Sequence, residues 1–551
     1  MNTGIVIWSI FGCDSSSNST ASPTDEIVLI EPVPLEGERL DSLKLARRVS
    51  LDLRGKYLSN AEAQQILENP DALDSLVDAW LDEPAHKEQL VSLFAAMTLT
   101  KVDEFNVNHQ DYGLQETLAY PFVLSIGEEA PRLMAEIATE DRPWTDLVTA
   151  DFTMANALLI DIWELESIEQ EPTTDSPWVK ARFKDGRPAG GIISTNGLWW
   201  RHYTTPNNKS RSRASFLTKF LVCDDHFTRE TAEIPVLRAD DGNVDEMAME
   251  DPVCKACHIT LDPVSAALYG FWQHDIHDVL ELQYYHPERE WMGEDELNLQ
   301  MAWYGKPLAS PAELGPAIAN DGRFASCAVS SLAEKMWRRQ LVEEDNGRLQ
   351  QLLFAFQDGE LRYSSLLKAI IQSPEYQLGE GALADSRHRS AAKLLYPAQM
   401  ASAITDLTTF EWIENEIPML DNDELGLRIL LGGIDGRMVN TWAVEPSSSR
   451  QLAYKRFSQL AADQAVELVW ERPDALDIFD QQDITAIDAS SSQFETIVHS
   501  LSIRILAEEP TPEQLELYKQ IFTQIAQAYD EKQAWKSLLS IIFRDSEAWI
   551  Y

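Results

Sequence analysis

Apolar residues recur every three or four positions along most of the chain, a spacing that predicts amphipathic helices. The first such region covers residues 36–100, where residues 43–51 and 73–81 follow this period. Between them, Ser59 and Glu62 have the spacing of a capping box, in which each side chain satisfies a backbone N–H of the other residue. These patterns predict a mainly α-helical chain with one helix beginning near Ser59.

A similar order of helices recurs twice later in the chain. Residues 332–376 and 501–551 each contain a short arginine-bearing helix, a polar N-cap, a long amphipathic helix and a final apolar helix. Residues 36–100, around Arg47 and Arg48, form the least regular copy. Such units bury their apolar faces against one another. We therefore expect a multi-domain, mainly α fold with repeated three-helix modules, whose arginines and tryptophans serve packing and helix ends.

The charge of the chain excludes some partners. Its 551 residues include 90 acidic and 45 basic residues, which gives a formal net charge of −45. Nucleic-acid binding and adsorption to anionic lipid both require basic patches, so we expect neither. A preference for cationic partners and a merely solvated acidic surface both fit this charge. The sequence contains no run of 18 apolar residues, and we predict no transmembrane helix.

The N-terminus resembles a bacterial lipoprotein signal. A short apolar stretch at residues 4–11 leads to Gly12 and Cys13, and a polar run follows at residues 14–24. The resemblance implies lipidation of Cys13 and a flexible tether after it, in the periplasm or at the outer membrane. The stretch departs from the usual pattern because it is short and no Lys or Arg precedes it. An incidental cysteine is the alternative.

A C-x-x-C-H motif, Cys254-Lys-Ala-Cys257-His258, carries the most specific chemistry of the chain. This spacing attaches a c-type haem, since two thiols bond to the vinyl groups and the histidine ligates the iron. A redox-active C-x-x-C pair and half of a zinc site are the alternatives. The first prefers a βαβ context and the second a nearby second ligand pair, and the sequence shows neither. We therefore predict one covalent haem c.

Two further cysteines, Cys223 and Cys327, flank this motif at a distance in the sequence. Outside the cytoplasm, an even pair of cysteines is more often a disulfide than two free thiols. We predict that they form a disulfide. Two buried thiols that pack as small apolar groups are the alternative.

The motif and its surroundings resemble the cytochrome-like domains of unknown function of planctomycetes and myxobacteria. The similar segments are residues 190–197, 205–211, 216–223 and 259–271, the last with Asp262-Pro263. Residues 141–156 look like the domain that usually precedes these segments, and Cys327 with residues 373–376 look like the one that follows. The resemblance implies an exported multi-domain protein with a haem. It implies little about activity.

These observations divide the chain into six expected parts. Residues 165–195 are rich in charge, proline and glycine, and residues 378–392 have the composition of a linker. We expect, in order, a lipoprotein signal and tether, an N-terminal helical module, a helical domain, a haem-binding domain, a second helical module and a C-terminal helical domain. Their expected bounds are residues 1–30, 31–120, 121–189, 190–325, 326–380 and 381–551.

The second axial ligand of the iron decides between electron transfer and catalysis. Met249 is the first candidate, with Met247 beside it, and both lie shortly before the motif. His202 is the second, since it stands among aromatic residues that could form a pocket wall. An open position also remains, as do three further histidines: His226, His274 and His277.

Two arginines and an acidic segment are further candidates for binding. Arg211 and Arg213 could pair with haem propionates, because guanidinium groups suit carboxylates, or they could belong to a solvated loop. Residues 240–245 could bind calcium, although they lack the closing glutamate of an EF-hand loop.

The expected function is that of an exported monohaem c-type cytochrome, anchored by lipid, that passes electrons to a redox partner protein or an envelope complex. A surface scaffold with structural haem and a haem-dependent oxidoreductase are the alternatives, so whether the chain is an enzyme stays open. The sequence contains no G-x-x-x-x-G-K, G-x-S-x-G or H-E-x-x-H motif. Nucleotide hydrolysis, serine-esterase and zinc-protease chemistry therefore have no support.

Overall fold

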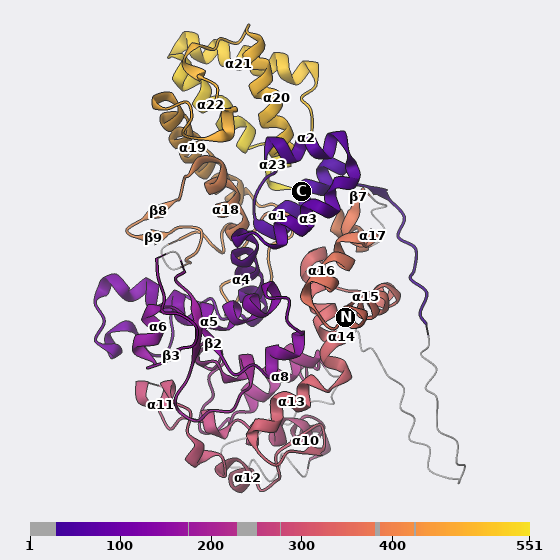
Figure 1. The fold of residues 1–551 in the computed structure, drawn as a ribbon, viewed down its shortest axis with the longest axis vertical. Coiled ribbons are helices and arrows are strands. Elements are labelled where there is room, and N and C mark those ends of the chain that lie inside the picture. The colour runs from indigo at the N-terminus through magenta and orange to yellow at the C-terminus, as the bar shows by residue number, and fades with distance from the viewer. Residues whose placement is uncertain (1–28, 175, 229–250, 276, 381–385, 424–425) are drawn as a thin grey trace.

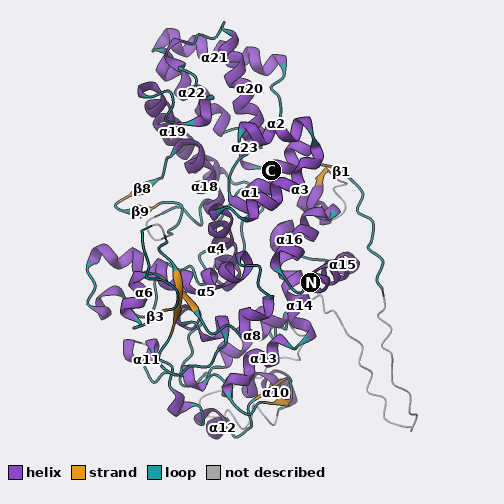
Figure 2. Cartoon of the chain, in the orientation of Figure 1, coloured by secondary structure: helices purple, strands orange, loops and turns teal. Residues whose placement is uncertain are grey.

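The computed structural model describes residues 29–174, 176–228, 251–275, 277–380, 386–423 and 426–551 (Figure 1). Helices dominate this part of the chain, and its strands are short (Figure 2). The predicted mainly α, multi-domain architecture is therefore confirmed. No helix among the described residues is both long and apolar enough to cross a membrane.

The first part of the chain forms five consecutive helices. Ser59 and Glu62 form the predicted capping box at the start of the second helix, with Ser59 N–H donating to Glu62 Oε2 at 2.8 Å. The fifth helix is buried along almost all of its length, because it packs against the fourth on one side and a small sheet on the other. These helices are α1 (Ser42–Arg54), α2 (Asn60–Glu68), α3 (Leu73–Leu81), α4 (Pro84–Thr98) and α5 (Ala119–Thr139).

The sheet against α5 has three antiparallel strands in the order β2 (Thr153–Ala155), β4 (Val179–Arg182) and β3 (Glu166–Ser167). Helix α6 (Ala157–Ile162) contacts β2, and helix α7 (Asn196–Arg201) packs against α5. Gly197 allows α7 to approach α5 closely, since a Cβ at this position would overlap the carbonyl oxygen of Ile126. This contact positions the start of the segment that leads to the C-x-x-C-H motif.

Short helices and one small hairpin make up the next segment. The helix that carries the C-x-x-C-H motif, α10, packs against α8 on one side and α12 on the other. This region lies at one end of the long axis of the molecule (Figure 1). Its elements are α8 (Arg211–Val222), α10 (Pro252–Ala266), α11 (Val279–Gln283), α12 (Met292–Leu297), β5 (Ala302–Trp303), β6 (Lys306–Pro307) and α13 (Leu314–Ala319).

Two regions adopt the repeated helical order that the sequence predicts. The first comprises α14 (Gly322–Trp337), α15 (Asn346–Asp358), α16 (Tyr363–Gln372) and α17 (Pro374–Gln377), and the second comprises α20 (Ser492–Leu506), α21 (Pro512–Ala528), α22 (Glu531–Phe543) and α23 (Ser546–Trp549). Strand β7 (Leu378–Glu380) pairs with β1 (Glu38–Arg39) after the first region. Helices α18 (Pro397–Thr408) and α19 (Ser448–Glu471), with the hairpin of β8 (Ile413–Glu414) and β9 (Ile417–Pro418), connect the two regions.

Helix α1 joins both repeats through two adjacent, buried arginines. Arg47 donates to the carbonyl oxygens of Ile505 and Glu547 at 2.7 and 2.9 Å, in the C-terminal repeat. Arg48 donates to those of Tyr376 and Leu378 at 2.8 and 2.9 Å, in the last helix of the first repeat and in the strand that follows it. Helix ends leave carbonyl groups without intrahelical partners, and these guanidinium groups satisfy such groups. The expected role of arginines at helix ends is confirmed at this position.

Two large apolar clusters form the core. The first runs from Leu43 to Tyr376, with Ala507 in addition, and so contains side chains from all the expected parts between residues 31 and 380. The second is built from residues between Leu395 and Tyr551, both included, together with Leu51 and Tyr57. Because α1 contributes Leu43 to one cluster and Leu51 to the other, this helix fastens the two cores together.

Candidate haem-attachment site

The C-x-x-C-H motif occupies the first two turns of α10. The Asp251 side chain caps this helix by accepting hydrogen bonds from the backbone N–H groups of Val253 and Cys254, at 2.8 and 3.4 Å, and Pro252 stands at its first position. Proline is favoured at this position because its missing N–H would have no intrahelical partner. Residues three and four apart share a face of a helix. Cys254, Cys257 and His258 therefore project from one side of α10.

Both thiols of the motif are free and partly exposed. Burial, the Asp251 carboxylate and the Cys257 thiol raise the pKa of Cys254 above its ordinary value. Redox-active C-x-x-C pairs depend on a lowered thiol pKa. The environment of Cys254 therefore does not favour the dithiol interpretation of the motif.

His258 is oriented by a buried carboxylate four residues further along α10. Its Nδ1 lies 2.9 Å from Oδ1 of Asp262, whose side chain is only 2% exposed. Arg211, at the start of α8, donates to both oxygens of Asp262, at 2.7 and 3.0 Å. Burial acts to raise the pKa of Asp262, but the hydrogen bonds from His258 and Arg211 outweigh it and hold the pKa below its ordinary value. Asp262 is therefore ionised at neutral pH.

This arrangement fixes the tautomer of His258. An ionised carboxylate can only accept hydrogen bonds, so Nδ1 of His258 must carry the proton that is donated to Asp262. In a neutral imidazole, the other nitrogen then holds a lone pair. Nε2 of His258 is thus available to ligate a metal ion, which is how a histidine holds haem iron.

Two large apolar side chains close to the motif are exposed. Phe227 is 84% exposed and Ile259 is 56% exposed. Phe227 follows His226, whose carbonyl oxygen lies 3.9 Å from Sγ of Cys257. Single exposed apolar side chains are common on protein surfaces, so these two are compatible with an attached group but do not by themselves mark a binding site. The shared face of the two thiols and His258, the lone pair on Nε2 and these apolar neighbours all fit a covalently attached haem.

Arg213 lies inside the protein, with its guanidinium group bound to protein acceptors. It donates to the carbonyl oxygens of Phe271 and His202 at 2.6 and 3.1 Å, and to the side chain of Gln273 at 3.2 Å. Burial lowers the pKa of Arg213 to about 9. All of these contacts are to groups of the protein. Arg211 also contacts a protein group, the carboxylate of Asp262. Pairing of either arginine with a propionate stays a prediction.

His202 is buried at the end of α7. Its Nε2 lies 2.8 Å from the carbonyl oxygen of Thr98, and its ring stacks on Phe216 with a centroid separation of 3.7 Å. Burial, which is the largest cause, lowers the pKa of His202 to about 3. Because a carbonyl oxygen only accepts, Nε2 is the donor, and only Nδ1 of His202 could ligate iron.

The other predicted ligands divide into three groups. His274 and His277 are held elsewhere, with the ring of His274 against Trp272 and Nδ1 of His277 near the carbonyl oxygen of Asn106. His226, another of the candidate ligands, is buried, and its carbonyl oxygen lies close to the thiol of Cys257. The remaining predictions, Cys13, residues 240–245, Met247 and Met249, lie outside the described residues.

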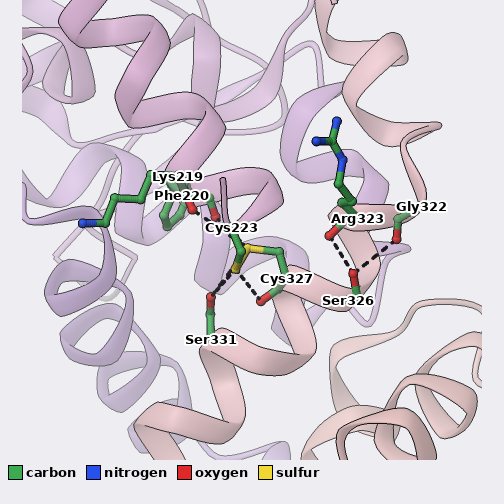
Figure 3. The surroundings of a disulfide bond; sticks show 8 residues. All are labelled: Lys219, Phe220, Cys223, Gly322, Arg323, Ser326, Cys327 and Ser331. Carbon is green, nitrogen blue, oxygen red and sulfur yellow. Dashed lines mark hydrogen bonds between the residues drawn. A yellow bond between two sulfur atoms is a disulfide. The ribbon is translucent and has the colours of Figure 1, made fainter. Parts of the chain in front are cut away.

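The predicted disulfide between Cys223 and Cys327 is present (Figure 3). Cys223 ends α8, and Cys327 lies on the buried side of α14. The hydroxyl of Ser331 lies 3.8 Å from one sulfur atom and 3.9 Å from the other. The bridge fastens α8, which carries Arg211, to the first helical repeat.

Asp262 is the functional residue whose role the sequence did not assign. Its separation of four residues from His258 places both side chains on one helix face, and this spacing could have identified it. In the part of the chain that the structure describes, no group of three or more His, Cys, Asp or Glu side chains has an arrangement that could hold a metal ion.

Comparison with known proteins finds one family model that is similar to part of the N-terminal half. The family model described as PSD4, a protein of unknown function (DUF1592), matches residues 40–165. This match covers α1 to α6 and ends before the haem motif. No curated protein and no solved structure matches the chain. The similarity fits the expected relation to domains of unknown function and supplies no chemistry for the motif.

Proposed function

We propose that the chain is an exported monohaem c-type cytochrome that transfers electrons in the cell envelope and is held to a membrane by lipid on Cys13. The observation that carries the proposal is the His258–Asp262 hydrogen bond of 2.9 Å, which leaves Nε2 as a ligand on the same helix face as Cys254 and Cys257. Haem bound there supplies a one-electron carrier. The location and the lipid anchor follow from the sequence pattern around Cys13.

Each residue of the site has a distinct part in this proposal. Cys254 and Cys257 would hold the group covalently, and His258 would ligate its iron. The motif lies on a partly exposed helix. A group held there would be accessible to a redox partner protein or an envelope complex, which suits electron exchange.

Absorption spectra of the haem-loaded protein test this function. We expect a low-spin spectrum in the reduced protein that is unchanged by carbon monoxide, because electron carriers keep both axial positions filled. The unloaded double variant Cys254→Ala/Cys257→Ala provides the baseline. A high-spin species that binds carbon monoxide would contradict electron transfer and favour a haem-dependent oxidoreductase, which needs an open position.

A further inference from the structure

We infer that Asp262 is a positioning residue that lowers the reduction potential of the haem held by His258, and that Arg211 limits this effect. The inference rests on the proposed function, since it concerns the same site. It arises from a chain of three side chains on two helices: His258 and Asp262 on α10, and Arg211 on α8. Each link of this chain is a short hydrogen bond.

Asp262 is the hydrogen-bond partner of His258, the proposed iron ligand. The hydrogen bond from Nδ1 of His258 is 2.9 Å long and joins residues one helical turn apart. The two hydrogen bonds from Arg211 hold the carboxylate from its other side, at 2.7 and 3.0 Å. A ligating histidine whose second nitrogen donates to a carboxylate has a fixed ring orientation and a more basic ligating nitrogen.

Burial makes the charge of Asp262 effective. The side chain is 2% exposed and that of Arg211 is 13% exposed, so water and salt screen this pair weakly. A negative charge next to the ligating imidazole stabilises the oxidised iron, which carries one more positive charge than the reduced iron. The positive charge of Arg211 acts in the opposite direction from a greater distance. The two residues therefore have effects of opposite sign on the reduction potential.

Two substitutions separate these effects. Asp262→Asn retains an acceptor for His258 and removes the negative charge, so we expect the potential to rise. We expect the potential to rise by about 59 mV, which for one electron corresponds to a tenfold change in the equilibrium between oxidised and reduced protein. Arg211→Gln leaves Asp262 without its cation, and we expect the potential to fall below that of the wild type.

The measurement is a spectroscopic redox titration of the intact, haem-loaded protein with soluble mediators. Asp295→Asn is the matched control, because Asp295 is exposed on α12, which packs against α10, and it should leave the potential unchanged. Circular dichroism establishes that each variant is folded. If Arg211→Gln does not fold, the direction of the Asp262→Asn shift decides.

The outcomes separate the inference from the function on which it rests. A rise for Asp262→Asn with a fall for Arg211→Gln supports the inference, since loosened packing around the haem would move both variants in the same direction. A loaded Asp262→Asn protein with the potential of the wild type, or a lower one, overturns it and leaves the proposed function intact. A wild-type protein that takes up no haem overturns the proposed function itself.

Discussion

His202 shows how burial governs a single titratable side chain. Its ring lies between Phe216 and the carbonyl oxygen of Thr98, and burial lowers its pKa from 6.5 to about 3. Between these two values, the unfolded chain binds a proton that the folded protein excludes. The free energy of unfolding therefore falls as the pH falls below about 6.5. The structure makes His202 a buried, neutral hydrogen-bond donor.

Replacement of His202 by glutamine should reduce this acid sensitivity. As the pH falls from 7.5 to 5.0, protonation of His202 in the unfolded chain should lower the free energy of unfolding by about 2 kcal/mol. His202→Gln should lose this pH dependence while keeping a donor for the carbonyl oxygen of Thr98. Urea denaturation at the two pH values measures the difference. His274→Gln, at an exposed position, should keep the pH dependence of the wild type. An unchanged pH dependence in His202→Gln would contradict a neutral, buried His202.

Residue types and spacing predicted part of the site. The thiols, His258 and the Cys223–Cys327 pair could be named from the sequence because covalent chemistry demands these residues. The contacts of Arg213 could not be predicted, because it donates to carbonyl oxygens of residues that are far away in the sequence, such as Phe271. Sequence spacing shows which helix face a residue shares, but not what packs against that face.

At the level of elements, local chemistry made the helices predictable and left their partners unknown. The capping box of Ser59 and Glu62 marks the start of α2 because both groups lie within one turn. By contrast, Arg47 of α1 contacts Ile505, which is 458 residues away in the sequence. The contacts of α1 with both repeats thus depend on tertiary packing, which local sequence patterns do not predict.

The disulfide links two elements that are far apart in the sequence, and its loss should lower stability. Cys223 and Cys327 are separated by 104 residues. Closure of a loop of that length restricts the unfolded chain by an amount worth about 4.7 kcal/mol in the chain-entropy model, and the typical measured stabilisation is about 2–4 kcal/mol. Cys223→Ser/Cys327→Ser should therefore unfold at lower urea concentration.

The control for this variant is the wild-type protein under reducing conditions, which should unfold at the same urea concentration as the double variant. Haem binding provides a second check. Because the disulfide lies between α8 and α14 and not in the motif, the double variant should still carry haem. Equal stability of the wild type and the double variant would show that the bridge does not constrain the unfolded chain.

At the level of the whole molecule, the charge of −45 acts against compactness. The 90 acidic residues outnumber the 45 basic ones two to one, so ion pairs cannot neutralise them all. Like charges on one surface repel one another, and salt screens this repulsion. Many basic groups that do pair, such as Arg211, are used inside the protein.

Added salt should therefore stabilise the protein. We expect the midpoint of thermal unfolding to rise when sodium chloride is increased from about 10 mM to about 500 mM, since the Debye length falls from about 30 Å to a few ångströms. Thermal unfolding in sucrose at the same osmolality is the control, because sucrose is excluded from the protein surface but does not screen charges. A midpoint that falls with salt would mean that attractive ion pairs dominate the surface.

Cys254, Cys257 and His258 should attach one haem, and haem content after denaturation measures this attachment most directly. The protein is produced together with a cytochrome c maturation system, denatured, and extracted with acidified acetone, which removes haem that is not covalently bound. We predict one haem per chain in the wild type and in Cys223→Ser/Cys327→Ser, and none in Cys254→Ala/Cys257→Ala. A folded wild-type protein without covalent haem would show that this motif does not attach haem.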